Sequence, residues 1–163
     1  MTSQLHSKNV SRYVGAHGVA QLLLWSSFYY LLPALSAQIV SQTGWPVLHV
    51  SMTYTTAFVL WALTAPLVGM LIDAGHGAKI MKVGAFIGVG ILVAISFASN
   101  MWVFSFFVVL LGMCMAATLY DPCFSVMLGC LDADGPKAVA TVTLIAGFAT
   151  LVTFPLVIGL ASF

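Results

Sequence analysis

Apolar residues fill five long stretches of this chain, and short polar segments separate them. The stretches cover residues 13–40, 50–72, 80–99, 101–119 and 138–161. A helix that crosses the hydrocarbon core of a bilayer needs about 20 mostly apolar residues, so each stretch predicts a transmembrane helix. Turn-forming residues such as Gly, Pro, Asn and Asp fill the separating segments, at residues 41–46, 74–77, 99–100 and 132–136.

The composition agrees with a membrane protein and excludes an ordinary soluble domain. The chain is 61% hydrophobic and 6% charged, and its mean hydropathy is +1.09, whereas soluble domains carry about 25% charged residues. A net charge of +1 gives no reason to expect nucleic acid as a partner, so the lipid bilayer is the first expected partner. The three cysteines have no metal-ligand spacing, and we expect them to pack, with no disulfide, metal or cofactor.

The positions of the basic residues predict the orientation in the membrane. They fall before the first stretch, between the second and third, and between the fourth and fifth: Lys8, Arg12, Lys79, Lys82 and Lys137. All five therefore lie on one side, which the positive-inside rule makes cytoplasmic. Residues 1–12 are then a cytoplasmic segment and Phe163 lies outside. The first apolar run is longer than the core of a signal peptide, so we expect it to be retained.

The segment from Pro66 to Lys79 carries the most specific motif. Gly69 and Asp73 are four residues apart and are followed by Gly77 and Lys79. This order resembles the loop between the second and third helices of the major facilitator superfamily of secondary transporters. The match needs one extra residue before Gly77, and Ala74 stands where the family has a basic residue.

The resemblance extends over nearly the whole chain. The stretch that ends in Tyr120-Asp121-Pro122 is similar to the fourth helix of bacterial relatives of monocarboxylate carriers. The resemblance implies an all-α membrane protein of the bacterial inner membrane, with helices one to five of a six-helix half. It also implies a partner in the form of a C-terminal half or a second subunit. The expected activity is that of a symporter for a small organic solute, with monocarboxylates as the first candidates.

An internal repeat supports the same architecture. Pro33 and Pro66 are 33 residues apart, and so are Pro122 and Pro155. A shift of 89 residues therefore superposes both pairs and relates spans one and two to spans four and five. Because an offset of three spans reverses the direction of the chain, this is an inverted three-helix repeat, as in each half of a major facilitator transporter.

The motif residues have expected roles in changes of conformation. Gly69 would allow two helices to approach closely, and the Asp73 carboxylate would accept from backbone N–H groups at a helix N-terminus in the other half. In the alternative interpretation, Asp73 is a local cap in a solvated turn. Asp121 is expected to end the fourth span near the cytoplasmic boundary, with Lys79 or Lys82 as its partner.

A stripe on the first span predicts a wall of the solute cavity. The side chains recur every four residues and therefore follow one slowly turning helix face: His17, Gln21, Trp25 and Tyr29. Thr118 on the fourth span is expected to face them. Such donors, acceptors and aromatic surfaces suit a small polar solute. The alternative is that these polar groups only bond neighbouring helices.

Three function classes were compared on these residues. The first is a transporter half that works by alternating access. The second is a non-transporting membrane subunit or inactive remnant that packs on a partner. An enzyme is not expected, because the sequence shows no Ser/His, HExxH or paired-Asp set inside the spans. We also expect no carboxylate at mid-membrane, which leaves His17 as the one titratable candidate and assigns proton coupling to the other half.

Overall fold

Helices make up nearly all of the structure. The computed structural model describes the backbone of residues 2–161 and the side chains of residues 10–131 and 133–160. The elements are α1 (Thr2–Leu24), η1 (Trp25–Tyr30), α2 (Leu31–Thr43), α3 (Val47–Leu71), η2 (Ile72–His76), α4 (Gly77–Ser96), α5 (Met101–Thr118), α6 (Tyr120–Leu131), η3 (Asp132–Asp134), α7 (Gly135–Gly147) and α8 (Ala149–Ala161).

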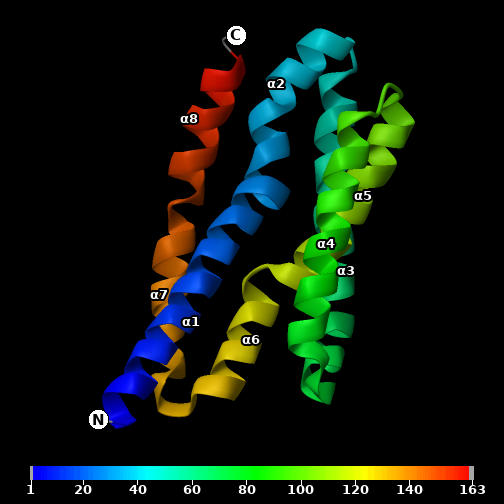
Figure 1. Cartoon of the computed structure of the whole chain (residues 1–163). Helices are drawn as coiled ribbons and strands as arrows, with labels where there is room; N and C mark the ends of the chain where they lie inside the picture. The colour runs from blue at the N-terminus through cyan, green and yellow to red at the C-terminus, as the bar shows by residue number, and fades with distance from the viewer. Residues whose placement is uncertain (1, 162–163) are drawn as a thin grey trace.

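Four helical stretches among the described residues are long and apolar enough to cross a membrane. They are Val10–Thr43, Val47–Ser96, Met101–Leu131 and Gly135–Leu160. The second has 50 residues and reverses direction at Gly75, where φ is 84°. As a result α3 and α4 run in opposite directions (Figure 1).

The turns end and start the helices where the sequence predicts them. Gly44 adopts φ 70° after α2, and its N–H donates to the carbonyl of Val40. The Asn100 side chain accepts from the backbone N–H of Trp102 and so caps α5. Gly is favoured at a left-handed position because it has no Cβ, and Asn is a favoured N-cap residue.

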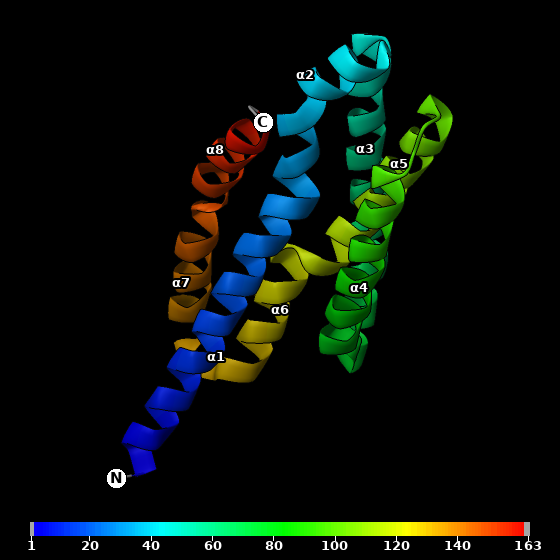
Figure 2. The ribbon, with the colours of Figure 1, turned by 45° about the horizontal axis from the view of Figure 1, so that its top comes forward.

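The helices form two groups that lie side by side, and their turns gather at two opposite ends of the molecule (Figure 1). The first span, α1 to α2, lies beside α7 and α8, while α3, α4 and α5 pack together, as Figures 1 and 2 show. The N-terminus, the α3–α4 turn and the α6–α7 turn lie at one end, and the α2–α3 turn, the α4–α5 turn and the C-terminus at the other. The described basic residues therefore belong to segments at or near the first end.

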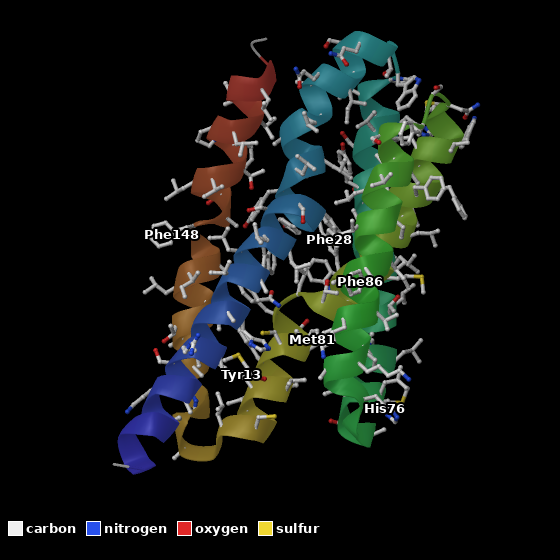
Figure 3. All side chains as sticks on the ribbon, viewed as in Figure 1. Tyr13, Phe28, His76, Met81, Phe86 and Phe148 are labelled. Atoms are coloured by element: carbon white, nitrogen blue, oxygen red, sulfur yellow. The ribbon has the colours of Figure 1, made fainter. Side chains whose placement is uncertain are left out.

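Small residues allow the closest contacts between helices. A Cβ at Gly112 of α5 would collide with the backbone carbonyl of Ala57 in α3, and one at Gly84 of α4 would lie 2.8 Å from the Cβ of Ala117. Gly88 faces the ring of Phe28, which lies between the first span and α4 (Figure 3). Membrane helices associate through such small-residue contacts.

The fourth span differs from the prediction in length. Its helix does not stop at residue 119 but breaks there and continues as α6 to Leu131. The predicted end rested on the charged and Pro residues after Leu119, which are typical of a boundary. The structure instead places them inside the helical stretch Met101–Leu131, and this break organises the candidate site.

Candidate functional site

The break between α5 and α6 lies at mid-height of the molecule (Figure 1). Leu119 has an extended conformation, with φ −77° and ψ −155°, and its side chain is buried. Three residues later Pro122 has no N–H, so it cannot donate to the carbonyl of Thr118 four residues before it. The local cause of the break, Pro122, is therefore visible in the sequence. The sequence does not show that the helix continues beyond the break.

A side chain from the first span bonds the carbonyl that Pro122 leaves free. The Gln21 Nε2 donates to the carbonyl oxygen of Thr118 at 2.7 Å and lies 3.5 Å from that of Leu119. Gln21 is 1% exposed. Irregular backbone at membrane depth requires such a partner, because lipid offers no hydrogen bonds. Gln21 thus joins α1 to the break across 97 residues of sequence.

Aromatic side chains surround Gln21 and the break. The Trp25 ring centroid lies 4.6 Å from that of Tyr120, 5.0 Å from that of Tyr29 and 6.2 Å from that of Trp61. Tyr29 also stacks on Phe58 at 5.4 Å. We call the following set the break site: Gln21, Trp25, Tyr29, Thr118 and Tyr120.

Two polar atoms of the break site are buried without a hydrogen-bond partner. They are Oε1 of Gln21, an acceptor, and Nε1 of Trp25, a donor. The two residues are one turn apart on the first span, so they are neighbours on one helix face. An acceptor and a donor at one place match a small molecule that offers one donor and one acceptor in return.

The sequence predicted Asp121 at the end of the fourth span. In the structure it lies well before the end of that helical stretch. It occupies the first turn of α6, with ten further helical residues after it. At 1.5 Å per residue, these place it roughly 15 Å from the end of α6. The side chain is exposed on the surface of the chain. Asp121 therefore lies inside a helical stretch that is long and apolar enough to cross a membrane, and an acid within such a stretch is a functional candidate.

The structure brings most of the predicted cavity residues together but leaves His17 apart. Gln21, Trp25, Tyr29 and Thr118 meet at the break site, whereas the His17 ring lies against Tyr13 and its Nδ1 is 3.0 Å from the Tyr13 carbonyl oxygen. Thr118 is 0% exposed, and its hydroxyl donates to the Cys114 carbonyl. The described hollow that touches Tyr29 measures about 10 Å³, which is too small for a solute in this conformation.

The residues of the α3–α4 motif are divided between open and packed positions. A Cβ at Gly69 would meet no atom within 4 Å, while one at Gly77 would lie 2.5 Å from a methyl group of Val126 in α6. The close helix contact expected at Gly69 is thus made at Gly77 instead. Asp73 and Lys79 are exposed beside the turn. Their roles in conformational change stay predictions.

A second polar cluster, which the sequence pattern alone did not predict, lies at the α3–α5 interface. His49 Nε2 is 2.8 Å from Ser105 Oγ, and Thr53 Oγ1 is 2.9 Å from the same oxygen. Ser105 also donates to the Met101 carbonyl. His49 and Thr53 share a helix face at a spacing of four, which is a visible signal. Ser105 is more than 50 residues away, and only helix packing brings it to them.

Two of the three cysteines are buried, as expected for residues that pack between helices. Cys114 and Cys123 are buried and Cys130 is exposed, and all three are free. Cys130 was expected to pack, but α6 turns it to the surface. Among the described residues no group of three or more His, Cys, Asp or Glu side chains could hold a metal ion.

Comparisons with protein-family models, with curated proteins and with solved structures find no match to this chain. The interpretation of the break site therefore depends on its own geometry.

Proposed function

We propose that this chain is the N-terminal portion of a secondary active transporter of the major facilitator type. It moves a small organic solute by alternating access, together with a second helical bundle. The observation that carries the proposal is the broken helical stretch Met101–Leu131. Gln21 of α1 bonds the freed carbonyl at the break, and Asp121 follows in the first turn of α6. Transporters place their solute sites at such discontinuous helices.

The proposed architecture has five crossings and an inverted repeat. The reversal at Gly75 makes two crossings of the stretch Val47–Ser96. The 89-residue shift that superposes the prolines also superposes Tyr30, the end of η1, on Leu119, where α5 breaks. The same shift relates α1 to α5 and α3 to α7. The contact of α1 with α7 therefore corresponds to the contact of α5 with α3, and both contacts are among the most extensive in the structure. A two-fold relation between the halves of the repeat explains both agreements.

Asp121 supports a partner that covers this surface. A carboxylate that faces lipid is costly, so acids in membrane segments face a bundle interior or a water-filled cavity. The described residues of this chain leave Asp121 exposed. A second bundle that packs here would enclose it, and we assign it the role of a proton or cation site during transport.

The proposed solute class follows from the unpartnered atoms of the break site. A carboxylic acid in its protonated form offers one O–H donor and one carbonyl acceptor. Gln21 Oε1 can accept from the former and Trp25 Nε1 can donate to the latter. The surrounding rings of Trp25, Tyr29 and Tyr120 would contact a short apolar tail. This favours small monocarboxylates over sugars, which need many more polar partners.

The proposed orientation follows from charge. The end that holds the α3–α4 and α6–α7 turns carries the basic residues, and cytoplasmic loops are enriched in Lys and Arg. We therefore place this end in the cytoplasm of a bacterial cell. The end that holds the α2–α3 and α4–α5 turns then faces outward.

Uptake by membrane vesicles from cells that naturally make the chain tests the proposal, because any natural partner is then present. Deletion of the chain is expected to remove saturable uptake of at least one radiolabelled short monocarboxylate. Restoring the chain as Asp121→Asn should leave the initial rate lower by about tenfold, a loss of roughly 1.4 kcal/mol of transition-state stabilisation. Asp134→Asn removes the same charge from an exposed turn and should restore uptake. Uptake that survives deletion, or equal rates for the two variants, would contradict the proposal.

The alternative is a non-transporting subunit that packs on a partner. The packed break site favours it, because a hollow of about 10 Å³ beside Tyr29 is too small to hold a solute. In that case Gln21 serves only to bond the broken helix. Deletion of the chain would then change the amount of a partner in the membrane, and Asp121→Asn would leave uptake unaffected.

A further inference from the structure

A groove runs between α4 and α5 on the surface of the bundle, away from the break site. Its volume is about 510 Å³. We call it the α4–α5 groove, and its lining is apolar except at one end: Leu71, His76, Lys79, Ile80, Val83, Gly84, Ile87, Ile91, Leu110, Met113, Cys114 and Ala117. The polar end belongs to the α3–α4 turn, where Figure 3 shows His76.

The floor and walls of the α4–α5 groove are suited to a chain-like apolar molecule. Gly84 forms part of the floor, where it packs closely on Ala117. Val83, Ile87 and Met113 form the walls, and each is between 44% and 53% exposed. In a bilayer these exposed side chains meet lipid tails, and the close approach of α4 and α5 at Gly84 forms a floor on which one tail can lie.

The dimensions of the α4–α5 groove match one leaflet. From Lys79 to Ile91 the groove follows twelve residues of α4, or roughly 18 Å at 1.5 Å per residue. Half of the hydrocarbon core is about 15 Å thick. The cationic end of the groove lies beside the α3–α4 turn, so it sits at the depth of lipid headgroups when the rest of the groove spans the tails.

We propose that the α4–α5 groove binds one anionic phospholipid. Its phosphate contacts the Lys79 ammonium and His76, and one acyl chain follows Val83 and Ile87. Basic sites between helices near the membrane surface bind anionic headgroups. The acid of the same turn, Asp73, is not part of the lining, so Lys79 is the one formally charged residue of the groove. The inference does not depend on transport.

Lipid retention tests the inference. The purified full chain is exchanged into a mild detergent with equal amounts of phosphatidylglycerol and phosphatidylcholine, and native mass spectrometry counts the lipids that stay bound. We expect one phosphatidylglycerol per chain. Lys79→Gln should lower the ratio of bound phosphatidylglycerol to phosphatidylcholine by about fivefold. Lys82→Gln makes the same charge change three residues away, outside the groove, and should leave the ratio unchanged.

A second variant separates the groove from general charge attraction. Ile87→Trp fills the apolar part of the groove and should lower retention of both lipids, although it keeps every charge. Equal retention of the two lipids by the wild type would overturn the inference, as would equal effects of Lys79→Gln and Lys82→Gln. A lipid-free dimer would also overturn it, because the groove would then hold a second copy of the chain.

Discussion

Gln21 shows how a single side chain permits an irregular helix in the membrane. Pro122 removes one N–H from the fourth span, and the carbonyl of Thr118 would otherwise be unpaired in an apolar interior. The Gln21 amide supplies the missing donor at 2.7 Å. Its remaining oxygen has no partner, which is the reason to regard this residue as part of a site as well as a support for the backbone.

Replacement of Gln21 by Leu is expected to destabilise the chain. The change keeps a side chain of similar size but removes its amide, so the Thr118 carbonyl is left unpaired, which costs about 1–3 kcal/mol for a buried group. Reversible unfolding in mixed detergent micelles, followed by circular dichroism, measures the difference in free energy of unfolding. Gln42→Leu is the matched control, because Gln42 is exposed in the last turn of α2. Equal stabilities for the two variants would show that the Gln21 contact contributes nothing.

Contacts between whole helices depend on a few glycines. The contact between α3 and α5 has almost no space at Gly112, where a Cβ would collide with the backbone of Ala57. A backbone atom cannot move aside as the end of a flexible side chain can. The two helices must therefore separate when a larger residue is introduced, and packing is lost along both.

Gly112→Ala is therefore expected to lower the free energy of unfolding by about 1–3 kcal/mol, as overpacked cores do. Gly90→Ala provides the control, because a Cβ there meets no atom within 4 Å. That change should be neutral or stabilising by about 0.5–1 kcal/mol, since Ala favours the helix. The same detergent unfolding measurement reports both. A neutral Gly112→Ala would mean that α3 and α5 do not pack as closely as described.

At the scale of the whole molecule, charge and apolar surface determine how the bundle sits in a bilayer. Large apolar side chains such as Phe86 and Phe97 are about four-fifths exposed, at 80% and 79%. Only a lipid environment or a protein partner removes such surface from water. The basic segments lie at one end, and from this we predict one preferred orientation in the membrane.

Thiol labelling of intact cells and inverted vesicles tests this orientation. The exposed native Cys130 precedes the α6–α7 turn and should react with a membrane-impermeant maleimide only in inverted vesicles. In a Cys130→Ser background, Ser99→Cys in the α4–α5 turn should react only in intact cells. Labelling of both positions from the same side would mean that the chain crosses the membrane an even number of times between them. The single crossing proposed for the fourth span would then be wrong.

The sequence by itself determined the helical, apolar class of the chain and several of its turns, because both depend on local patterns. Apolar length predicts spans, and Gly44, Gly75 and Asn100 mark turns through their own backbone preferences. Part of the break site was also predictable, since the spacing of Gln21, Trp25 and Tyr29 places them on one face. The Pro122 signal was visible too, but it was interpreted as the end of a span.

Only the tertiary structure decided what these residues contact. It continued the fourth helical stretch to Leu131, placed Asp121 in the first turn of α6, and gave the Thr118 carbonyl a donor from a helix 97 residues away. It also placed Ser105 against His49 and left Gly69 without a neighbour. The physical reason is that helix formation depends on near neighbours in sequence. Hydrogen bonds and close contacts between helices instead depend on which faces pack together, and an almost uniformly apolar sequence does not specify that locally.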